Sequence, residues 1–208
     1  MGVGSLGIIC IISIFLGAVT TVQTAFQLVS DLVPRSVIGG IVRDSSILEL
    51  SPTISAIVLA GKIGSSVASQ IGTMRVTEQI DALEIMGINS PGYLILPKIV
   101  GAITMIPLLV TISIALSILG GYLAGTISGA VTPQSFIEGL TTGFDPFTFT
   151  VSMIKSVIFA FIITSVAAYQ GFYTDGGALE VGQSSTKAVV ISCIMILFAD
   201  YLVAQLLL

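Results

Sequence analysis

The sequence predicts an all-α, polytopic integral membrane protein with five transmembrane helices and one short charged helix outside the hydrocarbon layer. The first observation is that four apolar stretches of roughly 20 or more residues carry at most one charge each, and a fifth carries two. About 20 apolar helical residues cross the ~30 Å hydrocarbon core of a bilayer. The second is composition, since 54% of the residues are hydrophobic and only 9% are charged, against about 25% charged in a soluble domain. Backbone polar groups in lipid must be satisfied within their own segment, so each run must be helical.

The predicted spans follow the apolar runs and fill one domain, residues 1–208, which leaves no room for a separate soluble catalytic domain. The first run has no basic residue before it and no charge until Asp31, so we interpret it as a retained span rather than a signal peptide. Pro107 predicts a kink in the third span. The spans are placed at about residues 3–29, 47–71, 99–127, 147–172 and 188–208.

The connecting segments hold most of the charged and helix-breaking residues. Residues 30–46 are too charged to span, and we expect a short amphipathic helix there, at the membrane interface. Residues 73–86 predict a polar helix that ends at Gly87. Residues 128–146 and the Gly-rich residues 173–187 are predicted to be loops. The Lys and Arg counts, three against two, favour a cytoplasmic location for the loops after the second and fourth spans.

Composition also excludes several kinds of site. The chain has no histidine, which removes the usual general base and the commonest metal ligand. Cys10 and Cys193 both lie inside apolar runs, which argues against a disulfide or a zinc site. The net charge of −4 offers no basic surface to nucleic acid. We therefore predict no catalytic residue, no metal site and no nucleic-acid partner.

Charged residues inside a span need a partner or a cavity, because each costs roughly 2.5–3.5 kcal/mol on insertion scales. Glu49 and Lys62 share the second span but lie 13 residues apart. This is ~20 Å along a helix, too far for a direct ion pair. Each therefore needs another partner or water, and structural pairing and a cavity-lining role both stay open.

Lys155 and Asp200 are predicted to form a structural ion pair across the last helical hairpin. Lys155 lies eight residues from Phe147, where the fourth span enters. Asp200 lies eight residues from Leu208, where the fifth span leaves at the same surface. Both residues are then ~12 Å below that surface, so their opposite charges neutralise each other on neighbouring antiparallel helices.

Small residues recur at every fourth position in two segments. Such spacing lets membrane helices approach closely. Tight packing within the chain and a homodimer contact both explain the pattern, and the sequence does not decide between them. The two series are Gly64, Ala68 and Gly72, and Gly121, Gly125 and Gly129.

Residues 73–86 form the most highly charged helical segment of the chain. Val76, Ile80, Leu83 and Gly87 share one face of it at helical spacing. A segment this short and charged cannot span, so it is either a solvated interfacial helix or a docking helix for a cytoplasmic partner.

Three motifs give the chain a family resemblance. It continues through residues 94–125, through the span that holds Lys155 and through residues 171–174 and 176–178, and it ends in residues 199–203. The motifs are Glu49-Leu50-Ser51-Pro52, Ala60-Gly61-Lys62-Ile63-Gly64 and Gly72-Thr73-Met74-Arg75-Val76-Thr77-Glu78-Gln79-Ile80-Asp81-Ala82-Leu83. With these motifs the sequence resembles the MlaE-type permeases, the membrane subunits of ABC systems that move phospholipids between membranes. The resemblance covers nearly the whole chain.

The resemblance implies a multi-pass permease of the bacterial inner membrane that moves phospholipid between inner and outer membranes as a homodimer. It implies an ABC ATPase subunit, a periplasmic MCE-type lipid-binding subunit and, as a further candidate, a small cytoplasmic accessory subunit. Residues 73–86 would be the cytoplasmic coupling helix that seats in the ATPase. The coupling candidates are Arg75, Glu78, Gln79, Asp81, Leu83 and Glu84.

The chain departs from the family pattern at two points. Ser51 stands before Pro52 in the ELGP-like motif, and Leu48 stands where a basic residue often precedes the glutamate. The family also has an interfacial helix before the first span, whereas this sequence starts almost at the span, which leaves open a longer N-terminus.

The Gly61-Lys62 pair is not part of a nucleotide-binding loop. Ala56 and Ile63 occupy the positions that need Gly and Ser or Thr. We therefore expect no cofactor on this chain, and ATP bound by a partner subunit. A non-transporting membrane scaffold and a stand-alone secondary transporter remain the alternative functions.

Overall fold

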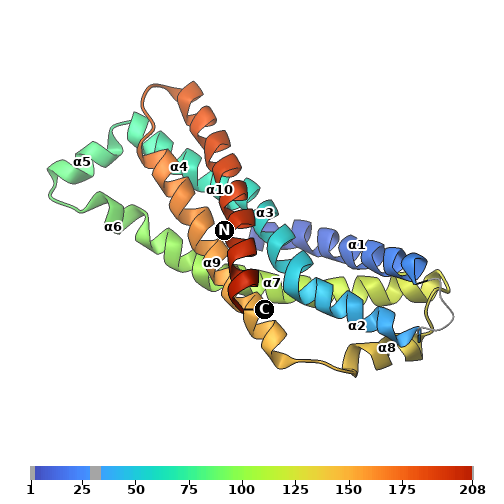
Figure 1. The fold of residues 1–208 in the computed structure, drawn as a ribbon. Coiled ribbons are helices and arrows are strands. Elements are labelled where there is room, and N and C mark those ends of the chain that lie inside the picture. The colour runs from blue at the N-terminus through green and yellow to red at the C-terminus, as the bar shows by residue number, and fades with distance from the viewer. Residues whose placement is uncertain (1–2, 29–33, 208) are drawn as a thin grey trace. The chain divides into compact units, whose positions relative to one another are not determined.

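The computed structural model describes residues 3–28 and 34–207, and within these residues the regular structure is helical, without strands (Figure 1). Five helical segments of the described residues are long and apolar enough to cross a membrane, which confirms the all-α polytopic fold. They are Gly4–Gln27, Ser36–Val76, Ser90–Ile127, Pro146–Phe172 and Ala178–Leu207.

The first span is the helix α1, Val3–Gln27. The second span has 41 residues and is made of successive α- and π-helical segments. Pro52, which has no backbone N–H, lies in the first of its two π-helical segments, where wider i→i+5 pairing accommodates the break. The segments are α2 (Ser36–Ser45), η1 (Ser46–Ile54), α3 (Ser55–Leu59), η2 (Ala60–Gly64) and α4 (Ser65–Val76).

The short helix predicted within residues 30–46 is present as α2, Ser36–Ser45, and it is continuous with the rest of the second span. From Ser36 onward the chain is helical, and Ser46 keeps helical dihedrals (φ −68°, ψ −40°), so α2 runs directly into the second span. Residues 30–33, like residue 29 at the predicted end of the first span, lie outside the described residues. Within this helix the Arg43 guanidinium pairs with the neighbouring Asp44 carboxylate at 2.8 Å.

The remaining helices are α5 (Gln79–Ile85), α6 (Ser90–Leu94), α7 (Leu96–Ile127), α8 (Pro133–Thr141), α9 (Pro146–Phe172) and α10 (Ala178–Leu207). Helix α8 occupies the middle of the predicted loop at 128–146. The Thr132 side chain accepts a hydrogen bond from the Ser135 N–H, and Pro133 opens the first turn, which together make a favourable helix start.

Helix α10 begins ten residues before the predicted fifth span, so the loop predicted over residues 173–187 is wrong from Ala178 onward. The Glu180 carboxylate accepts the Gly177 backbone N–H at 2.9 Å. This is the reciprocal half of a capping box, which starts a helix at this point. Gly182, one of the glycines that suggested a loop, lies within the helix.

The chain divides into two compact units. The α2–α8 unit comprises residues 6–55 and 108–154, and the α4–α10 unit comprises residues 3–5, 56–107 and 155–207.

The core of the α2–α8 unit lies where α2 and α8 run side by side (Figure 1). Ile38, Val42, Val131 and Phe136 are buried together there. A Cβ atom on Gly139 would overlap the Ser36 carbonyl oxygen, so only glycine permits this close approach of the two helices.

A buried network of serine hydroxyls also connects three spans of the α2–α8 unit. Ser113 of α7 lies 2.7 Å from Ser13 of α1 and 3.1 Å from Ser55 of the second span. One turn along α7, Ser117 lies 3.0 Å from Ser46. Such hydroxyl contacts stabilise helix association where the surroundings are as apolar as the helices.

In the α4–α10 unit, α4 packs against α10 and against the second half of α9 (Figure 1). A Cβ on Gly171 of α9 would lie 2.6 Å from the Ala68 carbonyl oxygen of α4. Small residues therefore bring the two helices into backbone contact in this unit.

Candidate functional site

The segment after the second span is a sharp corner rather than the single helix predicted over residues 73–86. Helix α4 ends at Val76, and Glu78 has left-handed dihedrals (φ 59°, ψ 15°) before α5 begins at Gln79. A non-glycine residue in this region is uncommon, and it separates the predicted helix into two. Gly87, with φ 77°, follows α5 as the sequence predicted.

Contacts on both sides of Glu78 fix the corner. The Arg75 guanidinium of α4 lies 2.5 Å from the Asp81 carboxylate of α5 and 5.9 Å from the centre of the Phe172 ring. Ile80 is fully buried under the corner. The ion pair, the ring contact and the buried side chain together hold α5 at a defined angle to α4.

The six coupling candidates therefore separate into two groups. Arg75 and Asp81 bind each other, and the Glu84 carboxylate accepts the Ser90 hydroxyl at 2.7 Å, so these three side chains shape the corner. Glu78 and Gln79 are exposed and Leu83 is half-buried.

Large apolar side chains follow at the tip of the corner. Ile85 is 88% exposed and Met86 is 65% exposed. These two neighbouring side chains form a small exposed apolar surface at the end of α5. These two residues are not among the coupling candidates predicted from the sequence, although both are apolar and stand beside charged residues.

The structure gives separate surroundings to the two charged residues of the second span. Glu49 is exposed on η1, in the α2–α8 unit. Lys62 is exposed on η2, in the α4–α10 unit, and its ammonium group donates a hydrogen bond to the Gly4 carbonyl at the start of α1. The partner that Lys62 needed is therefore a backbone carbonyl at a helix end.

Lys155 and Asp200 are brought together in the α4–α10 unit. The Lys155 Nζ atom lies 2.7 Å from Asp200 Oδ1, and the lysine side chain is fully buried. This geometry is that of a buried ion pair between α9 and α10.

The small-residue candidates all lie against helices of the same chain. Gly64, Ala68 and Gly72 are buried in the α4–α10 unit, where a Cβ on Gly72 would lie 3.3 Å from Val181 of α10. Gly121 and Gly125 are buried against Thr21 of α1. The five residues serve packing within the chain, and Gly129, with φ 69°, lies in the turn after α7.

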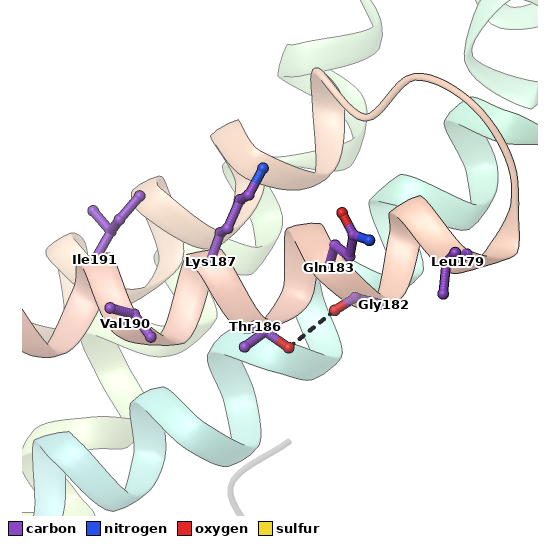
Figure 2. Close-up of a pocket in the computed structure, with 7 residues that line it drawn as sticks. All are labelled: Leu179, Gly182, Gln183, Thr186, Lys187, Val190 and Ile191. Atoms are coloured by element: carbon purple, nitrogen blue, oxygen red, sulfur yellow. Dashed lines mark hydrogen bonds between the residues drawn. The ribbon is translucent and has the colours of Figure 1, made fainter.

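A groove of about 590 Å³ runs along one face of α10 (Figure 2). Figure 2 shows Gln183 and Lys187 pointing the same way from the helix, while the Thr186 hydroxyl donates to the Gly182 carbonyl at 3.1 Å. This face was not predicted from the sequence, because most of its residues lie in the predicted loop at 173–187. The helical spacing of the lining residues was the available signal: Leu179, Gly182, Gln183, Thr186, Lys187, Val190 and Ile191.

Comparison with known proteins assigns the family. A family model described as permease MlaE matches residues 1–206. A probable ABC transporter permease protein of Rickettsia bellii is 36% identical over 208 residues, 99% of this chain and 79% of that protein. A protein of Synechocystis sp. with the same description is 34% identical over 209 residues, 99% of this chain and 78% of that protein.

A plant protein is similar as well. Protein TRIGALACTOSYLDIACYLGLYCEROL 1, chloroplastic, of Arabidopsis thaliana is 32% identical over 204 residues, 98% of this chain and 58% of that protein. The chain belongs to the MlaE permease family.

Proposed function

We propose that this multi-pass membrane permease moves phospholipid between the inner and outer membranes of a bacterium, driven by a separate ABC ATPase subunit. The family assignment and the description of the relatives as ABC transporter permeases support this function. A lipid substrate is further supported by the Arabidopsis relative, whose name refers to trigalactosyldiacylglycerol.

The observation that carries the proposal is the corner between α4 and α5. The second span, with 41 helical residues, leads directly into this corner. A rigid corner with an exposed apolar tip at Ile85 and Met86 is suited to transmit a partner's movement to the spans.

The surface of α1 supports an apolar path for acyl chains. Phe15, Val19 and Phe26 are 66%, 60% and 80% exposed. A groove of about 500 Å³ follows the same helix and is lined by Ala18, Val19, Val22, Gln23 and Phe26. In our proposal two copies of the chain form a homodimer, and the first two spans of each line a central lipid cavity.

The remaining assignments complete the proposed assembly. The corner faces the cytoplasm and seats in the ATPase. A periplasmic MCE-type subunit exchanges lipid with the opposite end of the permease, and a small cytoplasmic accessory subunit is a further candidate partner.

Purification from native membrane, followed by reconstitution, tests the proposal. Co-purifying chains identify the ATPase and lipid-binding subunits, and liposomes containing the assembly should transfer fluorescent phospholipid only with hydrolysable ATP. Transfer driven by an ion gradient without ATPase would instead establish a secondary transporter. An assembly that binds its partners but moves no lipid would establish a scaffold.

Cysteines along α1, in a chain without Cys10 and Cys193, test the cavity. They should crosslink between subunits and to photoreactive phospholipid. Labelling confined to the α10 groove of Figure 2 would place the lipid path there and contradict the cavity.

A further inference from the structure

A second groove lies along the first turns of α7, beside η2. Its volume is about 310 Å³. Ile63, Ala102 and Ile106 are buried and form an apolar floor, and Met105 is 40% exposed at the edge. A Cβ on Gly101 would meet no atom within 4 Å, so the groove is open at this position.

Lys98 lies at one end of this groove and gives it a positive charge. Its Nζ atom donates to the Gln70 side-chain oxygen of α4 at 2.6 Å. The amide of Gln70 is neutral, and no carboxylate among the described residues pairs with Lys98. An ammonium group has three donors, so two of them remain for a second acceptor.

The position of Lys98 in the chain places it at the boundary between headgroups and hydrocarbon. The 29 residues that follow it, 99–127, carry no charge. Lysines at the end of a span direct the charged group toward the interface while the stem lies on apolar surface. Tyr93, just before α7, is 65% exposed. Tyrosine is enriched at membrane interfaces, so its position agrees with an interfacial depth for Lys98.

We propose that this groove binds one phospholipid with an anionic headgroup. The Lys98 ammonium meets the phosphate, and the first part of one acyl chain lies on Ile63, Ala102 and Ile106. Basic pockets between membrane helices recognise anionic headgroups by this combination. A soluble phosphate ion would contact only the Lys98 ammonium group, whereas the apolar floor favours a molecule that also carries an acyl chain. The site is independent of which lipid is transported.

Native mass spectrometry of the full chain, titrated with phosphatidylglycerol or phosphatidylcholine, tests the site. The wild-type protein should bind phosphatidylglycerol about fivefold more tightly. Lys98→Gln, which can keep the bond to Gln70, should lose this preference, and Lys98→Arg should keep it.

Gly101→Leu, which fills the groove without changing charge, should weaken binding of phosphatidylglycerol. Arg35→Gln, which removes a charge beside α2, is the matched control.

Three results would overturn the site. They are an unchanged preference in Lys98→Gln, an equal loss in Arg35→Gln, and displacement of the lipid by glycerol phosphate at the same concentration. Thermal unfolding of each variant separates loss of the site from loss of the fold. Neither measurement involves the ATPase, so failure of this site and failure of the proposed transport function are distinguishable.

Discussion

Lys155 and Asp200 face each other in the interior of the α4–α10 unit, with the lysine Nζ 2.7 Å from the aspartate Oδ1. The Lys155 side chain is fully buried, and 13% of the Asp200 side chain is exposed. Either charge alone is expensive at membrane depth. Removing one partner leaves an uncompensated buried charge, whereas replacing both with apolar groups does not.

Lys155→Met should therefore lower the free energy of unfolding by about 3–5 kcal/mol. Lys155→Met combined with Asp200→Leu should recover part of this loss. Unfolding in mixed micelles measures both. Lys187→Met, at an exposed lysine of α10, is the control and should change little. A double variant no more stable than the single one would contradict a structural role for the pair.

The five spans were predictable because the bilayer imposes the same requirement on each of them. A run of apolar residues must be helical in lipid whatever its neighbours are. The same reasoning placed Lys155 and Asp200 at one depth, since depth depends only on the number of residues from the helix end.

The errors concern positions that tertiary contacts decide. In the sequence, the charge of Arg43 argues against a span. In the structure, Arg43 lies against α8 and donates to backbone carbonyls about a hundred residues away in the chain, including that of Leu140 at 2.8 Å. The corner at Glu78 depends on the Arg75–Asp81 pair and on the burial of Ile80. No local pattern encodes these contacts, so sequence periodicity alone favoured one unbroken helix over residues 73–86.

Two glycines of α1 provide a matched test of backbone contact. A Cβ on Gly17 would overlap the Ser117 carbonyl oxygen of α7, whereas a Cβ on Gly7 would meet nothing within 4 Å. Gly17→Ala should lower stability by about 1–3 kcal/mol because the helices must separate. Gly7→Ala should be neutral or slightly stabilising, because alanine is the better helix former. Equal thermal unfolding of the two variants would show that α1 and α7 do not approach this closely.

Arg43 should fix the C-terminal end of α8. Its guanidinium donates to the Leu140 and Thr142 carbonyls at 2.8 and 3.0 Å and pairs with Asp44. Arg43→Met should cost about 1.5–3 kcal/mol, the range for hydrogen bonds to charged groups, and should speed hydrogen exchange in α8. Arg35→Met, beside α2, is the control, because Arg35 is exposed and its hydrogen bond to the Ala130 carbonyl is long, at 3.4 Å. Similar exchange rates in the two variants would contradict this role.

Charge reversal at the corner tests its coupling role in the proposed transporter. Glu78 is exposed, whereas Asp81 holds Arg75 across the corner. Glu78→Lys changes only the outer surface, and Asp81→Lys also breaks the ion pair that sets the angle of α5. If the corner seats in the ATPase, the double variant should insert normally and permit ATP hydrolysis, while lipid transfer per ATP falls about tenfold.

The two single variants and a distant reversal identify the cause of that loss. Asp81→Lys should uncouple more strongly than Glu78→Lys, because a loosened corner transmits less of the ATPase movement than a rigid corner with an altered surface. Glu138→Lys, an exposed reversal on α8, should leave lipid transfer per ATP unchanged. The measurements are ATP turnover and phospholipid transfer in the same proteoliposomes. Normal coupling in the double variant would rule out the corner as the docking element, and equal uncoupling by Glu138→Lys would show a general effect of charge.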